Sequence, residues 1–206
     1  MAERWTLIFY RAPAQPSSAR VTAWRRLHRL GAVYLGPSSC LLPTRLEVDD
    51  DLQEIAATLV RAGGSLQSLT VAEFSDESEQ RLEALYNAAR DAEYDEVIER
   101  AEALVGELER EGARDKFTFA EVEENDADLA KLQRWARRVR WRDVYGAPRR
   151  QAAEDAVRRA QERLDQFVRI AASSEHEPGE AGVTPEGAGG IEELGDARTE
   201  EPPPGD

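Results

Sequence analysis

Short segments of alternating and amphipathic hydrophobicity fill the first 74 residues of this 206-residue chain. Aromatic and β-branched runs between turn residues are typical of strands, and three-to-four spacing of apolar residues is typical of helices. The pattern predicts a strand at 5–10, a helix at 17–30, a β-hairpin at 33–42, a helix that ends at Gly63, and a strand at 66–74. This β-α-β-β-α-β order predicts a ferredoxin-like α+β domain over residues 1–74.

Polar residues mark the expected starts of the helices. Ser17 is placed to cap the first helix, because Pro16 disfavours helical backbone before it. Asp51 with Glu54, and Thr118 with Glu121, have the spacing of a capping box. The run 49–51 is expected to place acidic groups at the positive end of the second helix.

The first strand is apolar on both faces. The first two helices can cover only one face of the sheet, so another part of the protein has to bury the second face. We assign one set of apolar residues to the face that the first two helices leave open: Ile8, Tyr10, Tyr34 and Leu41. Residues 76–170, or a second copy of the chain, are expected to bury this face.

Residues 75–173 are predicted to form a helical extension packed on the first domain. Apolar stripes indicate helices over 75–112, from 118 to 145, and from Pro148 onward. The first stripe loses phase near 91–93, which allows a break there. Residues 174–206 are rich in Gly, Pro and Glu and are predicted to be a disordered acidic tail.

The net charge of −14 is unevenly distributed. Residues 75–130 carry −13 and residues 174–206 carry −9, whereas residues 131–173 carry +7. Seven arginines against one acidic residue, Glu3, make residues 1–45 a second basic zone. An acidic protein with two basic zones is expected to bind its partners through those zones.

Eight arginines are the candidate nucleic-acid or anion ligands, because guanidinium groups form planar paired contacts with phosphate oxygens. In the predicted first helix Ala23, Leu27 and Leu30 face inward. For its arginines, a solvated face without a ligand is the alternative. In the second zone, where tryptophans are interleaved as in nucleic-acid binders, the alternative is pairing with the acidic residues of 75–130. The candidates are Arg20, Arg25, Arg26, Arg29, Arg134, Arg137, Arg138 and Arg142.

Other residues offer little chemistry. Cys40, the single cysteine, lies in an apolar strand and is predicted to be a buried thiol. Glu93, Tyr94 and Glu96 could orient a polar partner, although a solvated helix face is the simpler interpretation. We identify no catalytic residues, metal ligands or cofactor, and expect a non-enzyme. No apolar run approaches a membrane span and no signal peptide is evident, so we expect a cytoplasmic protein.

Several separated segments together resemble a known family. They are 17–43, with its arginine helix and Gly36-Pro37-Ser38-Ser39 turn, then 90–96, 116–121, 132–135 and 142–147. The chain resembles the N-terminal domain of ChrB-type chromate-resistance proteins. This resemblance implies a transcriptional regulator that binds the promoter of a chromate-efflux operon. Longer relatives carry a C-terminal domain associated with the chromate response, which we expect to be missing here because the chain ends in the acidic tail.

Two classes of function therefore remain open. The first is a DNA-binding regulator, or regulator-like protein, of a chromate-resistance system, with duplex DNA of its own operon promoter as partner. The second is a non-catalytic accessory module that docks a chromate-resistance partner protein through its helical extension. A homodimer is compatible with both.

Overall fold

The computed structural model describes residues 5–13 and 18–174, which form an α+β structure with a four-stranded sheet and five α-helices. Its first six main elements confirm the predicted β-α-β-β-α-β order. The elements are β1 (Trp5–Arg11), α1 (Ser18–Arg29), β2 (Val33–Gly36), β3 (Ser39–Pro43), a 3₁₀ turn (Thr44–Leu46), α2 (Asp49–Arg61), β4 (Ser65–Val71), α3 (Asp76–Gly112), α4 (Phe119–Arg142) and α5 (Arg150–Ser174). The predicted cap at Ser17 and the predicted acidic tail beyond residue 174 lie outside the described residues.

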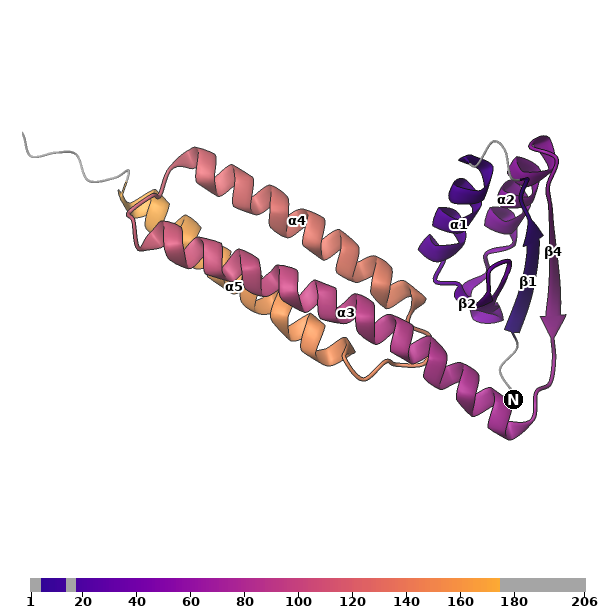
Figure 1. Ribbon diagram of the computed structural model, residues 1–206. Helices are drawn as coiled ribbons and strands as arrows, with labels where there is room; N and C mark the ends of the chain where they lie inside the picture. The colour runs from indigo at the N-terminus through magenta and orange to yellow at the C-terminus, as the bar shows by residue number, and fades with distance from the viewer. Residues whose placement is uncertain (1–4, 14–17, 175–206) are drawn as a thin grey trace, which may run out of the picture.

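The sheet is antiparallel, with strand order β2-β3-β1-β4. The central strand β1 pairs on both sides, so that Leu7 lies opposite Leu41 of β3 and Leu69 of β4. Helices α1 and α2 cover one face of the sheet (Figure 1). The core between them is completely apolar at its centre, where the side chains of Ile8, Leu27, Cys40, Leu42 and Leu59 are fully buried.

The predicted assignment of side chains to the two sheet faces is largely wrong. Ile8, Tyr10 and Tyr34 pack beneath α1 and α2, whereas Leu41 lies on the opposite face with Trp5. The register explains the difference, because Ile8 pairs with Cys40 and Leu7 pairs with Leu41. Both sets of β1 residues are apolar, so their pattern alone does not indicate which face the helices cover.

The helical extension covers only part of the second face. The first turns of α3 pack on it through Leu82 and Tyr86, near Trp5. Farther along the strands, large apolar side chains stay exposed, and these are Phe9 (43%), Leu35 (50%) and Leu69 (56%). The expectation that residues 76–170 bury the open face is therefore met at one end of the sheet.

Helix α3 is one continuous helix, and the break allowed near residues 91–93 does not occur. Its apolar stripe changes phase because the helix changes neighbours. The N-terminal third faces the sheet, and the rest packs with α4 and α5 in a separate core centred on Val97, Ala101, Val139 and Ala160. The three long helices extend away from the sheet as an elongated bundle (Figure 1).

The helix ends partly follow the predicted caps. The Thr118 side chain accepts a hydrogen bond from the Glu121 backbone N–H, as predicted. The prediction of a capping box at Asp51 is wrong, because α2 begins two residues earlier and its N-cap, Val48, provides no side-chain bond. The expected run of three aspartates does occupy the first turn, where the helix dipole favours negative charge. Among the described residues, no helix is long and apolar enough to cross a membrane.

Candidate functional site

Helix α1 presents its arginines on the side away from the sheet. Ala19, Ala23 and Leu27 are buried beneath it, in agreement with the predicted inward-facing stripe. Arg25 and Arg29 are four residues apart, so they lie one above the other on the exposed side. Two guanidinium groups are thereby held on one rigid helical surface.

Helix α4 separates apolar and basic sides in the same way. Leu132 and Val139 are buried in the core of the bundle, while Trp135 is half-buried beside them. The basic residues between these positions point to solvent, and they are Arg134, Arg137 and Arg138.

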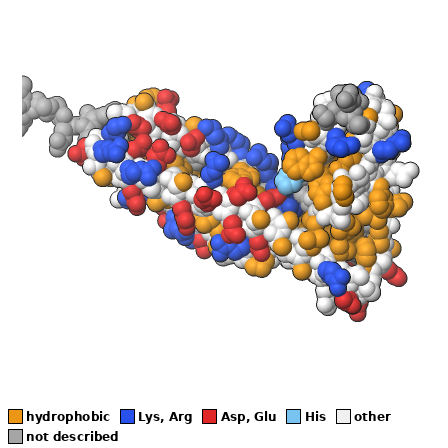
Figure 2. All heavy atoms as spheres, in the orientation of Figure 1, with side chains coloured by type: hydrophobic (Ala, Val, Ile, Leu, Met, Phe, Trp, Pro, Cys, Tyr) orange, Lys and Arg blue, Asp and Glu red, His pale blue; other side chains and the backbone are white. Residues whose placement is uncertain are grey.

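The two basic surfaces meet at an open cleft of about 630 Å³ between α1 and the C-terminal half of α4. In Figure 2 this cleft is the hollow next to His28, drawn in pale blue, with basic side chains on both sides of it. Helix α3 supplies two glutamates to the cleft. The lining residues are Trp24, Arg25, His28, Arg29, Glu93, Glu96, Trp135, Arg138 and Arg142.

An aromatic pair forms part of the α1 wall. The Trp24 and His28 rings are stacked, with centroids 5.4 Å apart and an interplanar angle of 10°. Trp24 keeps 46% of its surface exposed, so one side of the pair is open to a ligand. Arg20, one turn before Trp24 on the same helix, donates its guanidinium to the Ala12 carbonyl at 3.4 Å.

A buried charge cluster forms the floor beside the cleft. Glu93 of α3 accepts hydrogen bonds from Arg90, at 3.0 Å, and from Arg142 of α4. All three side chains are largely withdrawn from water, with 15%, 2% and 7% of their surface exposed. Two guanidinium groups share one carboxylate, so the cluster keeps a net positive charge next to the cleft.

The same two arginines fasten the end of α1. Arg142 donates to the Arg29 carbonyl and Arg90 donates to the Gly31 carbonyl, both at 3.1 Å. Cations at a helix C-terminus satisfy its free carbonyl groups and complement its dipole. The orientation of α1 relative to α4 is thereby fixed by charged hydrogen bonds from α3 and α4.

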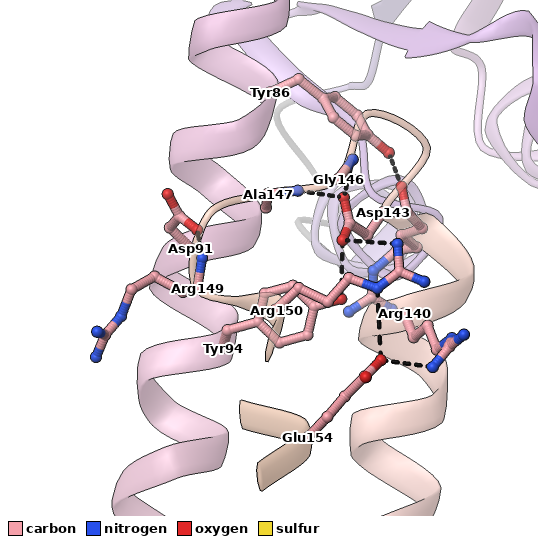
Figure 3. Close-up of polar contacts among 11 residues, drawn as sticks. Tyr86, Asp91, Tyr94, Arg140, Asp143, Gly146, Ala147, Arg149, Arg150 and Glu154 are labelled. Carbon is pink, nitrogen blue, oxygen red and sulfur yellow. Dashed lines mark hydrogen bonds and ion pairs between the residues drawn. The ribbon is translucent and has the colours of Figure 1, made fainter. Parts of the chain in front are cut away.

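A second buried group fixes the turn after α4 (Figure 3). The Asp143 side chain is completely buried and accepts the backbone N–H groups of Gly146 and Ala147, each at 2.9 Å. Tyr94 donates its hydroxyl to the other oxygen at 3.0 Å, and burial together with Asp143 raises the pKa of that hydroxyl. The last turn of α4, which carries Arg142, is therefore rigidly held.

The family model described as "Protein ChrB, N-terminal" matches residues 20–178. The chain belongs to the ChrB N-terminal family. It is also similar to Protein ChrB of Cupriavidus metallidurans (strain CH34), with 30% identity over 134 residues. That match covers 65% of this chain and 36% of the relative, so the chain spans little more than a third of the relative's length. The family resemblance inferred from the sequence is confirmed.

The ChrB-family region includes all the candidate arginines, but the structure divides them into groups. Four of them line the cleft: Arg25, Arg29, Arg138 and Arg142. Arg134 and Arg137 line a separate depression on α4 together with Arg138 and Trp141. Arg26 is paired with Glu54 at 3.3 Å, and Arg20 contacts the backbone as described above.

Ion pairing separates the available arginines of this ChrB-family chain from the structural ones. Arg142 is the only residue of 131–142 that pairs with another helix of the acidic segment 75–130, within the part of the chain that the structure describes. Lys131 pairs with Asp128 of its own helix and Arg140 pairs with Glu154 of α5, so internal ion pairs account for three members of the second basic zone. Among the described residues, five candidates form neither an ion pair nor a side-chain hydrogen bond: Arg25, Arg29, Arg134, Arg137 and Arg138.

Sequence analysis missed the importance of Glu93 and Tyr94. Tyr94 is buried and Glu93 binds two arginines, so the simpler interpretation of a solvated helix face is wrong for both residues. It holds for Glu96, which is exposed. The available signal was the apolar stripe losing phase at residues 91–93, where α3 passes from the sheet to the bundle.

Proposed function

We propose that this chain is a DNA-binding transcriptional regulator, or a regulator-like protein, of a chromate-resistance system. One observation carries the proposal: two basic zones more than 100 residues apart line the same cleft, through Arg25 and Arg29 on one wall and Arg138 on the other. Membership of the ChrB family, and the resemblance to ChrB-type chromate regulators, support the regulatory and chromate-related parts.

Electrostatics favours contact through the edges of this cleft. The chain as a whole carries −14, so DNA is repelled by most of its surface. Around the cleft, arginines without internal partners are concentrated, and they can replace the counterions that surround a phosphate backbone. We propose that Arg25, Arg29 and Arg138 contact phosphates. The buried Arg142 holds the end of α1 in position through its hydrogen bond to the Arg29 carbonyl.

The experiment is binding to DNA of the operon's own promoter, measured by fluorescence anisotropy over a series of salt concentrations. One variant replaces Arg25, Arg26 and Arg29 with Gln, and another replaces Arg137 and Arg138 with Gln. Each lost phosphate contact should reduce the slope of log affinity against log salt by about 0.9. Arg81→Gln is the control, because Arg81 is an exposed arginine near the start of α3 that does not line the cleft.

Stability measurements separate binding from folding in these variants. The replaced α1 residues lie opposite the buried Ala23 and Leu27, and Arg137 and Arg138 form no ion pair within the described residues. The free energy of unfolding should therefore stay within about 0.5 kcal/mol of the parent value. Unchanged affinity and unchanged salt slope in both variants would remove the DNA-binding proposal.

The alternative function is a non-catalytic accessory module that docks a partner protein of the same system. The exposed apolar side chains of the sheet favour it, since Phe9 (43%) and Leu69 (56%) are diagonal neighbours on the part of the second face that α3 leaves uncovered. A homodimer through the exposed sheet residues Phe9 and Leu69 is the simplest assembly of this kind. Light scattering after gel filtration distinguishes a dimer from a monomer.

The remaining parts of the proposal follow from this role. We propose that the chain is not an enzyme and acts in the cytoplasm, where a regulator meets its promoter. We assign residues 1–74 to a ferredoxin-like domain, because strand order β2-β3-β1-β4 suits that fold. Residues 75–173 are proposed to act as a helical extension that forms the second wall of the cleft.

A further inference from the structure

Phosphate contacts do not explain the aromatic rings of the cleft. Arginines alone bind a DNA backbone, yet the cleft also presents Trp24 and His28 on one wall and Trp135 on the other. Trp24 is 46% exposed although it is already stacked on His28, so its ring offers a free face. Exposed rings beside arginines are the combination by which proteins hold unpaired bases.

We propose that the cleft binds a nucleotide unit, that is, an unpaired base together with its phosphate. The source is a single-stranded nucleic acid or a free nucleotide. Trp24 and Trp135 are the stacking surfaces for the base, and Arg29 and Arg138 are the phosphate ligands. This inference goes beyond the proposed binding of duplex DNA and does not depend on it.

The volume of the cleft agrees with a ligand of this size. Sites for small organic ligands range from about 300 to 1,000 Å³, and the cleft measures about 630 Å³. Duplex DNA stacks each base between its neighbours, so its bases offer no free ring face to a tryptophan. In addition, the Arg25 side of α1 faces α4 across the cleft, so this side of α1 is not free to enter a major groove.

The charges around the cleft leave room for a phosphate. Of the two carboxylates, Glu93 is already bound by Arg90 and Arg142. Glu96 is exposed, and it stands against Arg25, Arg29 and Arg138, none of which forms an ion pair among the residues that the structure describes. The cleft therefore keeps an excess of positive charge that a phosphate can neutralise.

The test compares two exposed tryptophans by fluorescence anisotropy of a short labelled single strand and of its annealed duplex. Trp24→Leu removes the stacking surface of the cleft, and Trp141→Leu removes a similarly exposed ring that lines only the other depression on α4. We expect Trp24→Leu to weaken single-strand binding about fivefold or more, as base–aromatic stacking requires, and to leave duplex binding unchanged. Trp24→Phe, which keeps a ring, should restore most of the affinity.

Competition with unlabelled adenosine monophosphate and with inorganic phosphate identifies the ligand. Displacement of the probe by the nucleotide at concentrations where phosphate has no effect supports a base-plus-phosphate site. Equal competition by the two compounds would overturn the inference, and so would equal effects of Trp24→Leu and Trp141→Leu in proteins with the same circular dichroism spectrum.

These outcomes are separable from those of the proposed function. Single-strand binding that depends on Trp24, without any promoter binding, would contradict only the DNA-binding regulator. Promoter binding that depends on Arg25 and Arg29 but is insensitive to Trp24, with no binding of single strand or nucleotide, would contradict only the nucleotide site.

Discussion

The backbone of Gly31 lies against the side chain of Arg142, so closely that a Cβ at position 31 would be 2.7 Å from Arg142 Cδ. The same Cβ would be 2.7 Å from Arg90 Nη1. Gly31 also has φ of +90°, a conformation that other residues rarely adopt. Two separate constraints therefore require glycine at the point where α1 meets the two buried arginines.

Gly31→Ala should destabilise the protein more than a glycine replacement that introduces backbone strain alone. Gly63 is the matched control, because its φ is +81° and its Cβ would meet nothing within 4 Å. Gly63→Ala should cost about 1–2 kcal/mol, and Gly31→Ala should cost about 1–3 kcal/mol more, because it also displaces the arginines. Urea denaturation measures both, and equal losses would contradict the close packing of Arg142 on Gly31.

Glu93→Gln should be strongly destabilising. Among the residues that the structure describes, Glu93 is the carboxylate that pairs with both Arg90 and Arg142, and its loss leaves these two largely buried cations without an ionic partner there. Breaking a buried ion pair in this way costs about 3–5 kcal/mol. Glu96→Gln is the control on the same helix, where an exposed carboxylate should change the free energy of unfolding by less than about 0.5 kcal/mol.

If Glu93→Gln and Glu96→Gln have equal stability in chemical denaturation, the cluster does not hold α1 against the extension. If Glu93→Gln is destabilised but folded, its DNA affinity should also fall, because the two walls of the cleft lose their common anchor.

The order of elements was predictable because it depends on local patterns, whereas the cleft was not. Each arginine zone is recognisable within about twelve residues of sequence, but the contact that unites them joins Arg142 to Arg29, 113 positions apart. No periodicity in either segment specifies that contact. The inward and outward sides of α1 were predicted correctly, since one buried stripe determines both.

For β1, unlike α1, the sequence did not indicate which face is covered by the helices α1 and α2. Strand alternation predicted which residues share a face, but Trp5, Leu7 and Phe9 are as apolar as Ile8 and Tyr10. Both faces have to be covered, one by α1 and α2 and the other in part by α3. The packing of Tyr86 of α3 and of Tyr145 against Trp5 distinguishes the second face, and these contacts between distant segments have no local signal.

Alkaline pH should destabilise the fold through Cys40. Burial raises the pKa of this thiol from 9.0 to about 12, so the folded state keeps its proton while the unfolded state loses it. The stabilising contribution is complete below pH 9 and is lost as pH rises from 9 towards 12, by about 1.4 kcal/mol per pH unit. Cys40→Ala removes this dependence, although its cavity lowers stability at every pH.

Urea denaturation of both proteins at a series of pH values above and below 9 measures the difference between their slopes. Burial, and then Tyr10 and Cys40, raise the pKa of Tyr34, so a Tyr34→Phe background in both proteins removes its titration from the comparison. Parallel pH profiles for the two proteins would show that the Cys40 thiol reaches solvent in the folded state.

Deletion of residues 174–206 should affect binding more than stability. The segment carries −9 and few large apolar residues, so it has little surface to contribute to a core. The melting temperature of the shortened protein should stay nearly unchanged, whereas promoter binding should tighten because the protein loses nine net negative charges that repel DNA. The gain should shrink as salt is raised, since the Debye length falls to about 10 Å at 0.1 M.

A chain of the same length with its acidic residues from 175 onward replaced by Gln and Asn is the matched control. If charge is the cause, that chain should bind as tightly as the deletion, and a large loss of thermal stability on truncation would show instead that the segment belongs to the fold.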